Sequence, residues 1–232
     1  MLDWFEWNGH RCTEYGIHVS EHPEITFPAE RSTFTNVPGR SGSMTVLEDA
    51  EVYDDLLLTC SCFIENTDRL TEIAAWLRGN GKVTFANRQG GYYYARIVNQ
   101  IPFEQVLRGR PHRTFSVTFR CFPMFYLAPD EDITVTETGT YIENPGTLAA
   151  EPVLKITLSG DAEITIGGYC FELKNVTGTV TVDTPMLECY QEQTSKNGCM
   201  YGDYPKIPAT GAFINWTGAV SQIVITPNWR TL

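Results

Sequence analysis

The sequence predicts a mainly β protein built from two units, with a single α-helix. Strand-forming residues are abundant, with 27 Thr, 15 Val, 15 Ile and 28 aromatic residues among 232. Helix formers are scarce, because the chain has only 13 Ala, 15 Leu and 5 Lys. Glycine, proline and asparagine-glycine turn signals recur roughly every ten residues in the second half, a spacing typical of antiparallel β-sandwiches.

Charge divides the chain into two parts. Residues 1–129 hold 12 of the 17 basic side chains, 11 of them arginine, whereas residues 130–232 hold 5 basic and 13 acidic ones. The acidic, proline-marked segment that begins at Ala128-Pro129-Asp130 reads as the connection. We therefore predict one domain at 1–129 and another at 130–232.

In the first unit the elements follow from local patterns. Pro38-Gly39 predicts a tight turn, because Pro presets φ and Gly accepts a positive φ. Tyr92–Ile101 and Phe115–Phe119 predict strands. A helix is expected at Thr67–Arg78, started by Asn66 or Thr67 and closed by Gly79. Its apolar stripe has helical spacing and is expected to pack on a sheet face; the stripe consists of Leu70, Ile73, Ala74 and Leu77.

In the second unit short apolar runs alternate with turn signals. The turn signals include Gly160 and Gly218. The predicted strands are Val153–Leu158, Glu163–Ile166, Val176–Val182, Ala212–Trp216 and Gln222–Thr226.

Composition argues against several classes of function. A net charge of −11 disfavours binding to nucleic acid or to an anionic membrane surface. No apolar run reaches the roughly 20 residues of a membrane helix. The start, Met1–Glu6, has acids where a signal peptide needs bases, and seven cysteines without an export signal predict reduced, mostly buried thiols.

Histidines suggest metal chemistry only weakly. His18-Val19-Ser20-Glu21-His22 matches the inverted zinc-protease motif, which requires a helix to bring both imidazoles to one metal. Gly16 and Pro23 favour an extended segment instead, in which His18 and His22 lie about 13 Å apart. A zinc site formed by His10, Cys12, His18 and His22 remains an alternative, although the spacing matches no familiar zinc module.

Other chemistry is not specified by any motif. Cys60 and Cys62 would share one face of a strand, which suits two buried side chains better than a metal site. Asp161 and Glu163 could share another face, and Asp130–Asp132 are contiguous, but a solvated acidic edge explains both better than paired catalytic acids. We predict no catalytic residue, no metal and no cofactor.

Two groups of residues are candidates for subunit contacts. Arg108, Arg110 and Arg113, together with His112, form a basic cluster that suits the acidic surface of a neighbouring subunit better than phosphate. Trp4 and Trp7 belong either to the core, which we favour, or to an interface.

The order of short motifs resembles the distal tail (Dit) proteins of long-tailed, non-contractile bacteriophages over nearly the whole chain. The motifs of the first half are Phe5-Glu6-Trp7-Asn8-Gly9, Glu30-Arg31, Val37–Gly42, Trp76-Leu77 with Gly79, Tyr93–Arg96 and Phe115–Pro123. Those of the second half are Asn144–Thr147, Ala150-Glu151-Pro152, Gly202–Pro205, Asn215–Gly218 and Pro227–Arg230.

This resemblance implies a fold and a role. The first domain would be a tail-tube-like β-sandwich with one helix that builds a hexameric ring, and the second a galectin-like β-sandwich. The ring would be a hub at the tail tip of the virion, made in the host cytoplasm. It would join the major tail tube protein to tail-associated and receptor-binding proteins and would let DNA pass without binding it. At 232 residues the chain has no room for the carbohydrate-binding module that is inserted in some relatives.

A carbohydrate-binding module that attaches to host cell-wall glycan is the alternative function. It rests on four aromatic residues of the second unit that could stack on sugar rings, although aromatic residues of a β-sandwich more often belong to the core. They are Tyr190, Tyr201, Tyr204 and Trp216.

Overall fold

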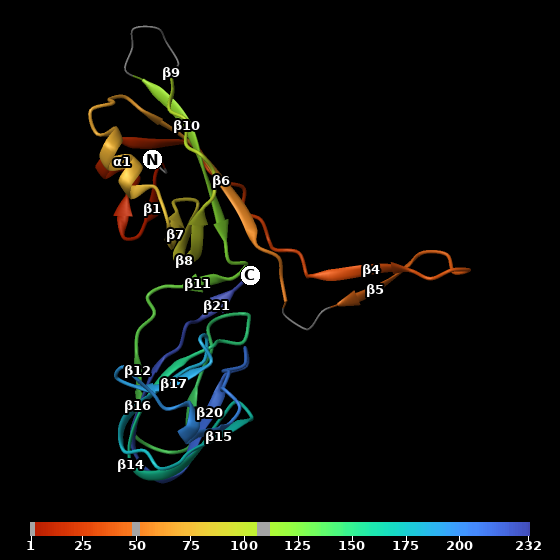
Figure 1. Ribbon diagram of the computed structural model, residues 1–232, viewed down its shortest axis with the longest axis vertical. Helices are drawn as coiled ribbons and strands as arrows, with labels where there is room; N and C mark the ends of the chain where they lie inside the picture. Colours follow the sequence, from red (N-terminus) through yellow and green to blue (C-terminus); the bar gives the residue numbers. More distant parts are fainter. Residues whose placement is uncertain (1–2, 48–51, 106–111) are drawn as a thin grey trace. The chain divides into compact units, whose positions relative to one another are not determined.

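The computed structural model describes residues 3–47, 52–105 and 112–232 and shows a mainly β protein (Figure 1). The chain forms two compact units, residues 1–125 with Leu232, and residues 126–231. The passage from the first unit to the second falls within strand β11 (Phe125–Leu127). The prediction of a mainly β fold is confirmed.

The first unit contains ten strands before β11, one α-helix and one 3-10 helix in its described residues. They are β1 (Phe5–Trp7), β2 (His10–Arg11), η1 (Cys12–Tyr15), β3 (Ile17–Glu21), β4 (Ser32–Asn36), β5 (Ser43–Leu47), β6 (Leu56–Ile64), α1 (Leu70–Trp76), β7 (Asn80–Phe85), β8 (Arg88–Ile97), β9 (Glu104–Gln105) and β10 (Arg113–Cys121).

The main sheet of this unit has the order β2-β1-β7-β8-β10-β6-β3. The sheet curls back on itself. The amide of Val19 on β3, at one end of the sheet, donates a hydrogen bond of 2.9 Å to the carbonyl of Asp3, which precedes β1 near the other end. A single curled sheet therefore encloses the core of this unit.

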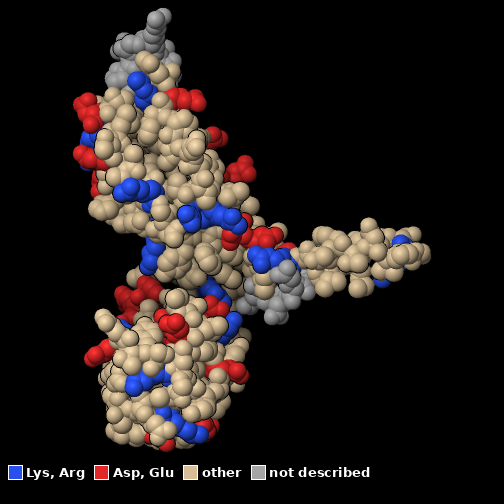
Figure 2. Space-filling model, in the orientation of Figure 1, with Lys and Arg blue, Asp and Glu red and all other residues tan. Residues whose placement is uncertain are grey.

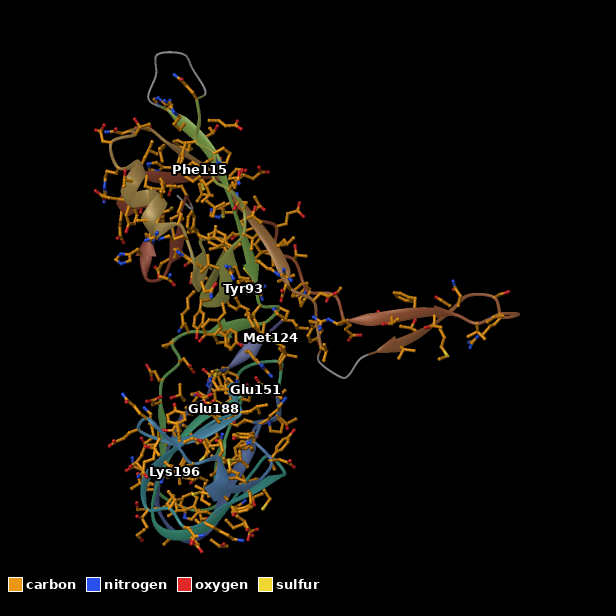
Figure 3. All side chains as sticks on the ribbon, in the orientation of Figure 1. Tyr93, Phe115, Met124, Glu151, Glu188 and Lys196 are labelled. Atoms are coloured by element: carbon orange, nitrogen blue, oxygen red, sulfur yellow. The ribbon has the colours of Figure 1, made fainter. Side chains whose placement is uncertain are left out.

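Alternation along the strands builds this core. β6 and β10 pair with each other over nine residue pairs, and in both strands every second residue points into the core. Phe119 lies at the centre, with its ring 5.4–5.6 Å from the rings of Phe5, Trp7 and Phe85. Tyr93 and Phe115, labelled in Figure 3, are also buried. The predicted strand at 115–119 is thus the middle of a longer one.

The predicted helix exists but is shorter than Thr67–Arg78. Its N-cap is Arg69, not Asn66 or Thr67, because Asn66 instead accepts a hydrogen bond of 2.9 Å from the amide of Asp68 in the preceding turn. Ile73 is fully buried, and the ring of Trp76 stacks on Phe5 at 5.7 Å. The helix therefore packs on the sheet face that carries β1, as expected. Of the predicted stripe Ile73 and Leu77 are buried, but Ala74 is exposed, and Trp76, which was not part of the stripe, makes the contact with β1.

The second unit continues with ten strands and a second 3-10 helix. They are β12 (Ile133–Val135), β13 (Thr140–Ile142), β14 (Val153–Ile166), β15 (Tyr169–Leu173), β16 (Gly178–Asp183), β17 (Glu188–Gln191), β18 (Thr194–Ser195), η2 (Asn197–Cys199), β19 (Met200–Gly202), β20 (Ala212–Thr226) and β21 (Arg230–Thr231).

Two long strands run through both layers of this sandwich. The first half of β14 pairs with β16, and its second half, Ala162–Ile166, pairs with β15. Likewise β20 pairs with β13 at its start and with β12 near its end. The prediction of separate strands on either side of Gly160 and Gly218 is wrong, because these glycines permit a bend with shifted register instead of a turn.

Between the layers lies one continuous apolar core that includes Ile156, Ile164, Phe171, Ile214 and Ile223, all fully buried. At its margin the guanidinium of Arg230 is almost completely buried. It donates to Glu151 at 3.0 Å and to the carbonyl of Ala149 at 2.6 Å. Glu151 is labelled in Figure 3. The ion pair between Arg230 and Glu151 thus lies at the margin of the apolar core.

Candidate functional site

The β4–β5 hairpin stands out because it forms a two-stranded sheet of its own. Five residue pairs hold it together, from Ser32 opposite Leu47 to Asn36 opposite Ser43. Neither strand pairs with the ten-stranded sheet. The predicted Pro38-Gly39 turn lies at its tip, with Gly39 at φ +80°.

Apolar side chains of the hairpin are exposed on both of its faces. Phe34 is 67% exposed on one face, whereas Met44 and Val46, 46% and 45% exposed, lie on the other. From Ser32 to Leu47 the only charged residue is Arg40, at the tip. Figure 2 shows the hairpin almost without red or blue, in contrast to the rest of the first unit.

The base of the hairpin is fixed by polar contacts. The amide of Arg31 donates to the carbonyl of Val52 at 2.9 Å, and Glu30 forms a β-bridge with Tyr53. The Arg31 side chain donates to Asp54 at 2.9 Å. These contacts join the two segments that flank the hairpin, so its two arms stay paired at the base.

A hairpin of this kind is incomplete in a single chain. An isolated two-stranded sheet is at best marginally stable in water, and exposed strand edges invite pairing with another chain. Natural proteins usually protect such edges with charges, and this hairpin has one arginine. Its chemistry therefore suits a surface that another protein chain covers.

Of the subunit-contact candidates, two lie outside the described residues, namely Arg108 and Arg110. Arg113 begins β10 and donates to the carbonyl of His112 at 3.1 Å. Trp7 is fully buried and belongs to the core, the alternative we favoured. Trp4 is half-buried under the guanidinium of Arg11, 4.3 Å from the ring centre. An interface role for Trp4 and the arginines stays a prediction.

Three of the four candidate zinc ligands have separate partners. His18 lies on β3, and its Nδ1 is 3.1 Å from Asp3; His10 is 3.2 Å from Glu14. The Cys12 sulfur accepts a hydrogen bond from the amide of Phe5 at 3.3 Å. His22 follows β3, so the motif from His18 is a strand rather than a helix. Residues 3–47, 52–105 and 112–232 contain no cluster of three metal-ligating side chains.

Most of the cysteines are inert. All seven are free thiols, and Cys60 and Cys62, which are separated by Ser61, are both buried on the core face of β6. Burial raises the pKa of Cys12 to about 11 and that of Cys121 to about 12, so neither thiol is a nucleophile at neutral pH. Five of the seven thiols are buried, Cys199 is half-buried and Cys170 is exposed, so the prediction of mostly buried thiols holds.

The candidate acids have structural partners. Asp161 accepts from the amide of Asn175 at 2.9 Å, and Glu163 accepts from the Cys170 thiol at 3.2 Å. Asp130 accepts from the amide of Asn228 at 3.2 Å, and Asp132 from the hydroxyl of Thr226 at 2.5 Å. These acids anchor loops and strands.

The four aromatic residues proposed to stack on sugars do not form one group. Tyr204 and Trp216 are half-buried and pack against the core of the second unit. Tyr201 is 53% exposed on β19, whereas Tyr190 is half-buried on β17, in the other layer.

Sequence reasoning missed the hairpin as a surface, although a signal was present. Between Arg31 and Glu48 there is a run of 16 residues with a single charge and alternating apolar residues on both sides of Pro38-Gly39. That pattern is typical of a hairpin. Its lack of charged residues is typical of a surface that is covered by protein, because solvent-facing surfaces are usually rich in charge.

The fold defines a class: two consecutive β-rich units, the first a curled sheet covered by one helix, the second a two-layer sandwich. Over 100% of both chains it is similar to the crystal structure of Dit (gp19.1) of phage SPP1, with a TM-score of 0.77 and 14% identity. That protein is described as a paradigm of the hub adsorption apparatus in phages that infect Gram-positive bacteria. The resemblance to the Dit family is thus confirmed at the level of the fold.

A second similar structure is the baseplate of phage p2 in its activated conformation with Sr, at a TM-score of 0.47, 8% identity and coverage of 97% of this chain and 98% of that chain. No family model matches the sequence, and no curated protein matches it. In the described part of the chain no helix is long and apolar enough to cross a membrane.

Proposed function

We propose that this protein is a structural hub of a phage tail tip and that it acts by assembling, not by catalysis. The observation that carries the proposal is the full-length similarity in fold to the SPP1 hub protein. In this role it resides in the virion, is made in the host cytoplasm, and joins the tail tube to host-recognition proteins.

Self-association into a closed ring, hexameric by the resemblance, is the next step of the proposal. The β4–β5 hairpin supports it, because an exposed hairpin on one copy that docks on a different surface of the next copy makes a heterologous contact. Such contacts build a closed ring where the rotation between neighbouring copies closes. The exposed apolar side chains of Phe34, Met44 and Val46 supply the apolar surface that the contact buries.

Light scattering and native mass spectrometry of the purified chain test this step. We expect a ring of about six copies, as closed cyclic symmetry requires a fixed copy number. Phe34→Asp and Val46→Asp should shift the mass to the monomer, because each places an unpaired carboxylate in the contact. Met186→Asp is the matched control, since Met186 is 67% exposed but lies in the second unit. A wild-type chain that stays monomeric at all concentrations contradicts the proposal.

Passage of DNA through the ring fits the charge of the chain. With a net charge of −11 per copy, an assembled ring repels phosphate, so that DNA slides without being held. In this proposal Arg108, Arg110 and Arg113 of the arginine-rich first domain serve subunit contacts. Tight retention of DNA by the ring at low salt would contradict the sliding of DNA. An unchanged ring mass in light scattering after charge reversal of the three arginines would contradict their role in subunit contacts.

A further inference from the structure

One face of the second unit combines exposed aromatic rings with hydrogen-bonding side chains. It is the outer face of the layer formed by β13, the first half of β20, the second half of β14, β15 and β19. Alternation buries Ile164, Ile166, Phe171 and Ile214 on the inner face and turns their neighbours outward.

Tyr141 and Phe213 form an aromatic pair on this outer face. They are directly opposite each other on β13 and β20, with ring centres 5.0 Å apart. Tyr141 is 50% exposed and Phe213 59%. Single exposed apolar residues are ordinary, but two adjacent rings form a continuous apolar platform.

The ring of Tyr141 is held in place. Its hydroxyl donates a hydrogen bond of 2.5 Å to the carbonyl of Thr210. The phenol lies over Gly211, where a Cβ atom would be 2.5 Å from the Tyr141 hydroxyl and 2.5 Å from the carbonyl of Ile142. Because Gly211 has φ +81°, the backbone there also disfavours any other residue. A ring fixed before binding loses little entropy when a ligand stacks on it.

Polar side chains continue the platform along the strands. Asn215 follows Phe213 on the same face of β20, about 7 Å further on, and Thr165 on β14 lies opposite Asn215. Glu163 is two residues from Thr165 and is exposed. The face thus offers an amide that both donates and accepts, a hydroxyl that does the same, and a carboxylate that accepts.

This combination matches the chemistry of a saccharide. A pyranose ring has an apolar face of C–H groups, which can stack on aromatic rings, and a rim of hydroxyls, which bond to amides, hydroxyls and carboxylates. Of the cations near this face, Lys174 is already paired with Glu172 and lies 5.5 Å from the ring centre of Tyr201. Because the Lys174–Glu172 pair is neutral as a whole, the exposed Glu163 leaves a negative charge on this face, which disfavours anionic glycans.

We propose that the outer face around Tyr141, Phe213 and Asn215 binds a neutral saccharide chain. This proposal goes beyond the hub role and does not depend on ring formation. It also differs from the sugar site expected from the sequence, of which only Tyr201 lies on this face.

Titration of the full chain with neutral oligosaccharides of glucose, galactose, mannose and N-acetylglucosamine tests the proposal by calorimetry and saturation-transfer NMR. We expect at least one series to bind, and Phe213→Ala and Asn215→Ala to weaken binding about tenfold or more. Tyr141→Phe keeps the ring but loses the hydrogen bond to Thr210, so a smaller loss is expected. Phe122→Ala is the matched control, because Phe122 is a 60% exposed aromatic residue of the first unit and belongs to neither proposed surface.

Three results would overturn the proposal: no binding at millimolar concentrations, equal losses in the control and the Phe213 variant, or a preference for a polyanionic glycan. Circular dichroism of each variant confirms that the fold is retained. The mass of the assembly, measured on the same samples, reports separately on the hub proposal.

Discussion

The β4–β5 hairpin and the β14–β20 ladder are both antiparallel pairs rich in β-branched residues, yet they use these residues differently. In β14 and β20 alternate residues enter the core, and Ile156, Ile164, Ile214 and Ile223 are completely buried. In the hairpin Phe34, Met44 and Val46 remain exposed. A sequence rich in β-branched residues is thus enough for two strands to pair. The stability of the pair depends on whether other parts of the protein cover the two faces of the sheet.

The largest expected difference concerns an apolar side chain in each region. Ile164→Ala should lower the free energy of unfolding of the second unit by about 4 kcal/mol, because it leaves a cavity in a closed core. Phe34→Ala should change it by less than about 0.5 kcal/mol, because that ring is exposed in the single chain. Urea unfolding at a concentration at which the chain is monomeric measures both. Equal effects would show that the hairpin is covered within its own chain.

A smaller difference separates the ion pairs of the two regions. Arg230→Gln should cost about 3 kcal/mol, because it leaves Glu151 partly buried without its main partner. Arg31→Gln at the base of the hairpin should cost about 1 kcal/mol or less, because its pair with Asp54 is about half exposed. Calorimetric melting at neutral pH compares the two variants. A larger loss of stability for Arg31→Gln than for Arg230→Gln would contradict the conclusion that the buried ion pair contributes more than the exposed one.

The same pair makes stability depend on pH. Burial alone would raise the pKa of Glu151, but Arg230 and Lys206 outweigh it and hold the pKa below its ordinary value of 4.5. The ionised form therefore stabilises the folded state fully above pH 4.5, and this contribution is lost as the pH falls through the lowered pKa. Wild type should lose stability along this acid limb, and Glu151→Gln should lose less. Parallel acid limbs in the two proteins would show that the carboxylate contributes nothing.

The smallest difference concerns glycine. Gly218→Ala should cost about 2 kcal/mol, because Gly218 has φ +88° and a Cβ would lie 2.3 Å from the carbonyl of Asp161. Gly39→Ala at the hairpin tip also meets a positive φ, but no atom lies within 4 Å of the added carbon. Only local strain of about 1 kcal/mol is expected there, confined to the hairpin. Hydrogen exchange distinguishes the local effect from the global one.

Local patterns predicted much of the fold. Alternation located Phe115–Phe119 and the strands of the second unit, and the helical spacing of Leu70, Ile73 and Leu77 located α1, because periodicity records which face is buried. Helix ends and strand continuity were predicted less well. Asn66 forms a turn instead of a helix cap. Gly160 lies at a bend within β14, where a strand end was expected, because a glycine in the sequence is equally compatible with a bend within a strand and with a turn between strands.

The sequence by itself determined that this chain is β-rich, acidic, divided into two units and without a catalytic motif, because composition, charge and periodicity are properties of the sequence. Only the tertiary structure decided that Phe34 is exposed while Trp7 is buried, and that Tyr141 meets Phe213. Exposure and contact depend on pairing between strands distant in sequence, and a β ladder can bring together residues 72 positions apart that no local pattern connects.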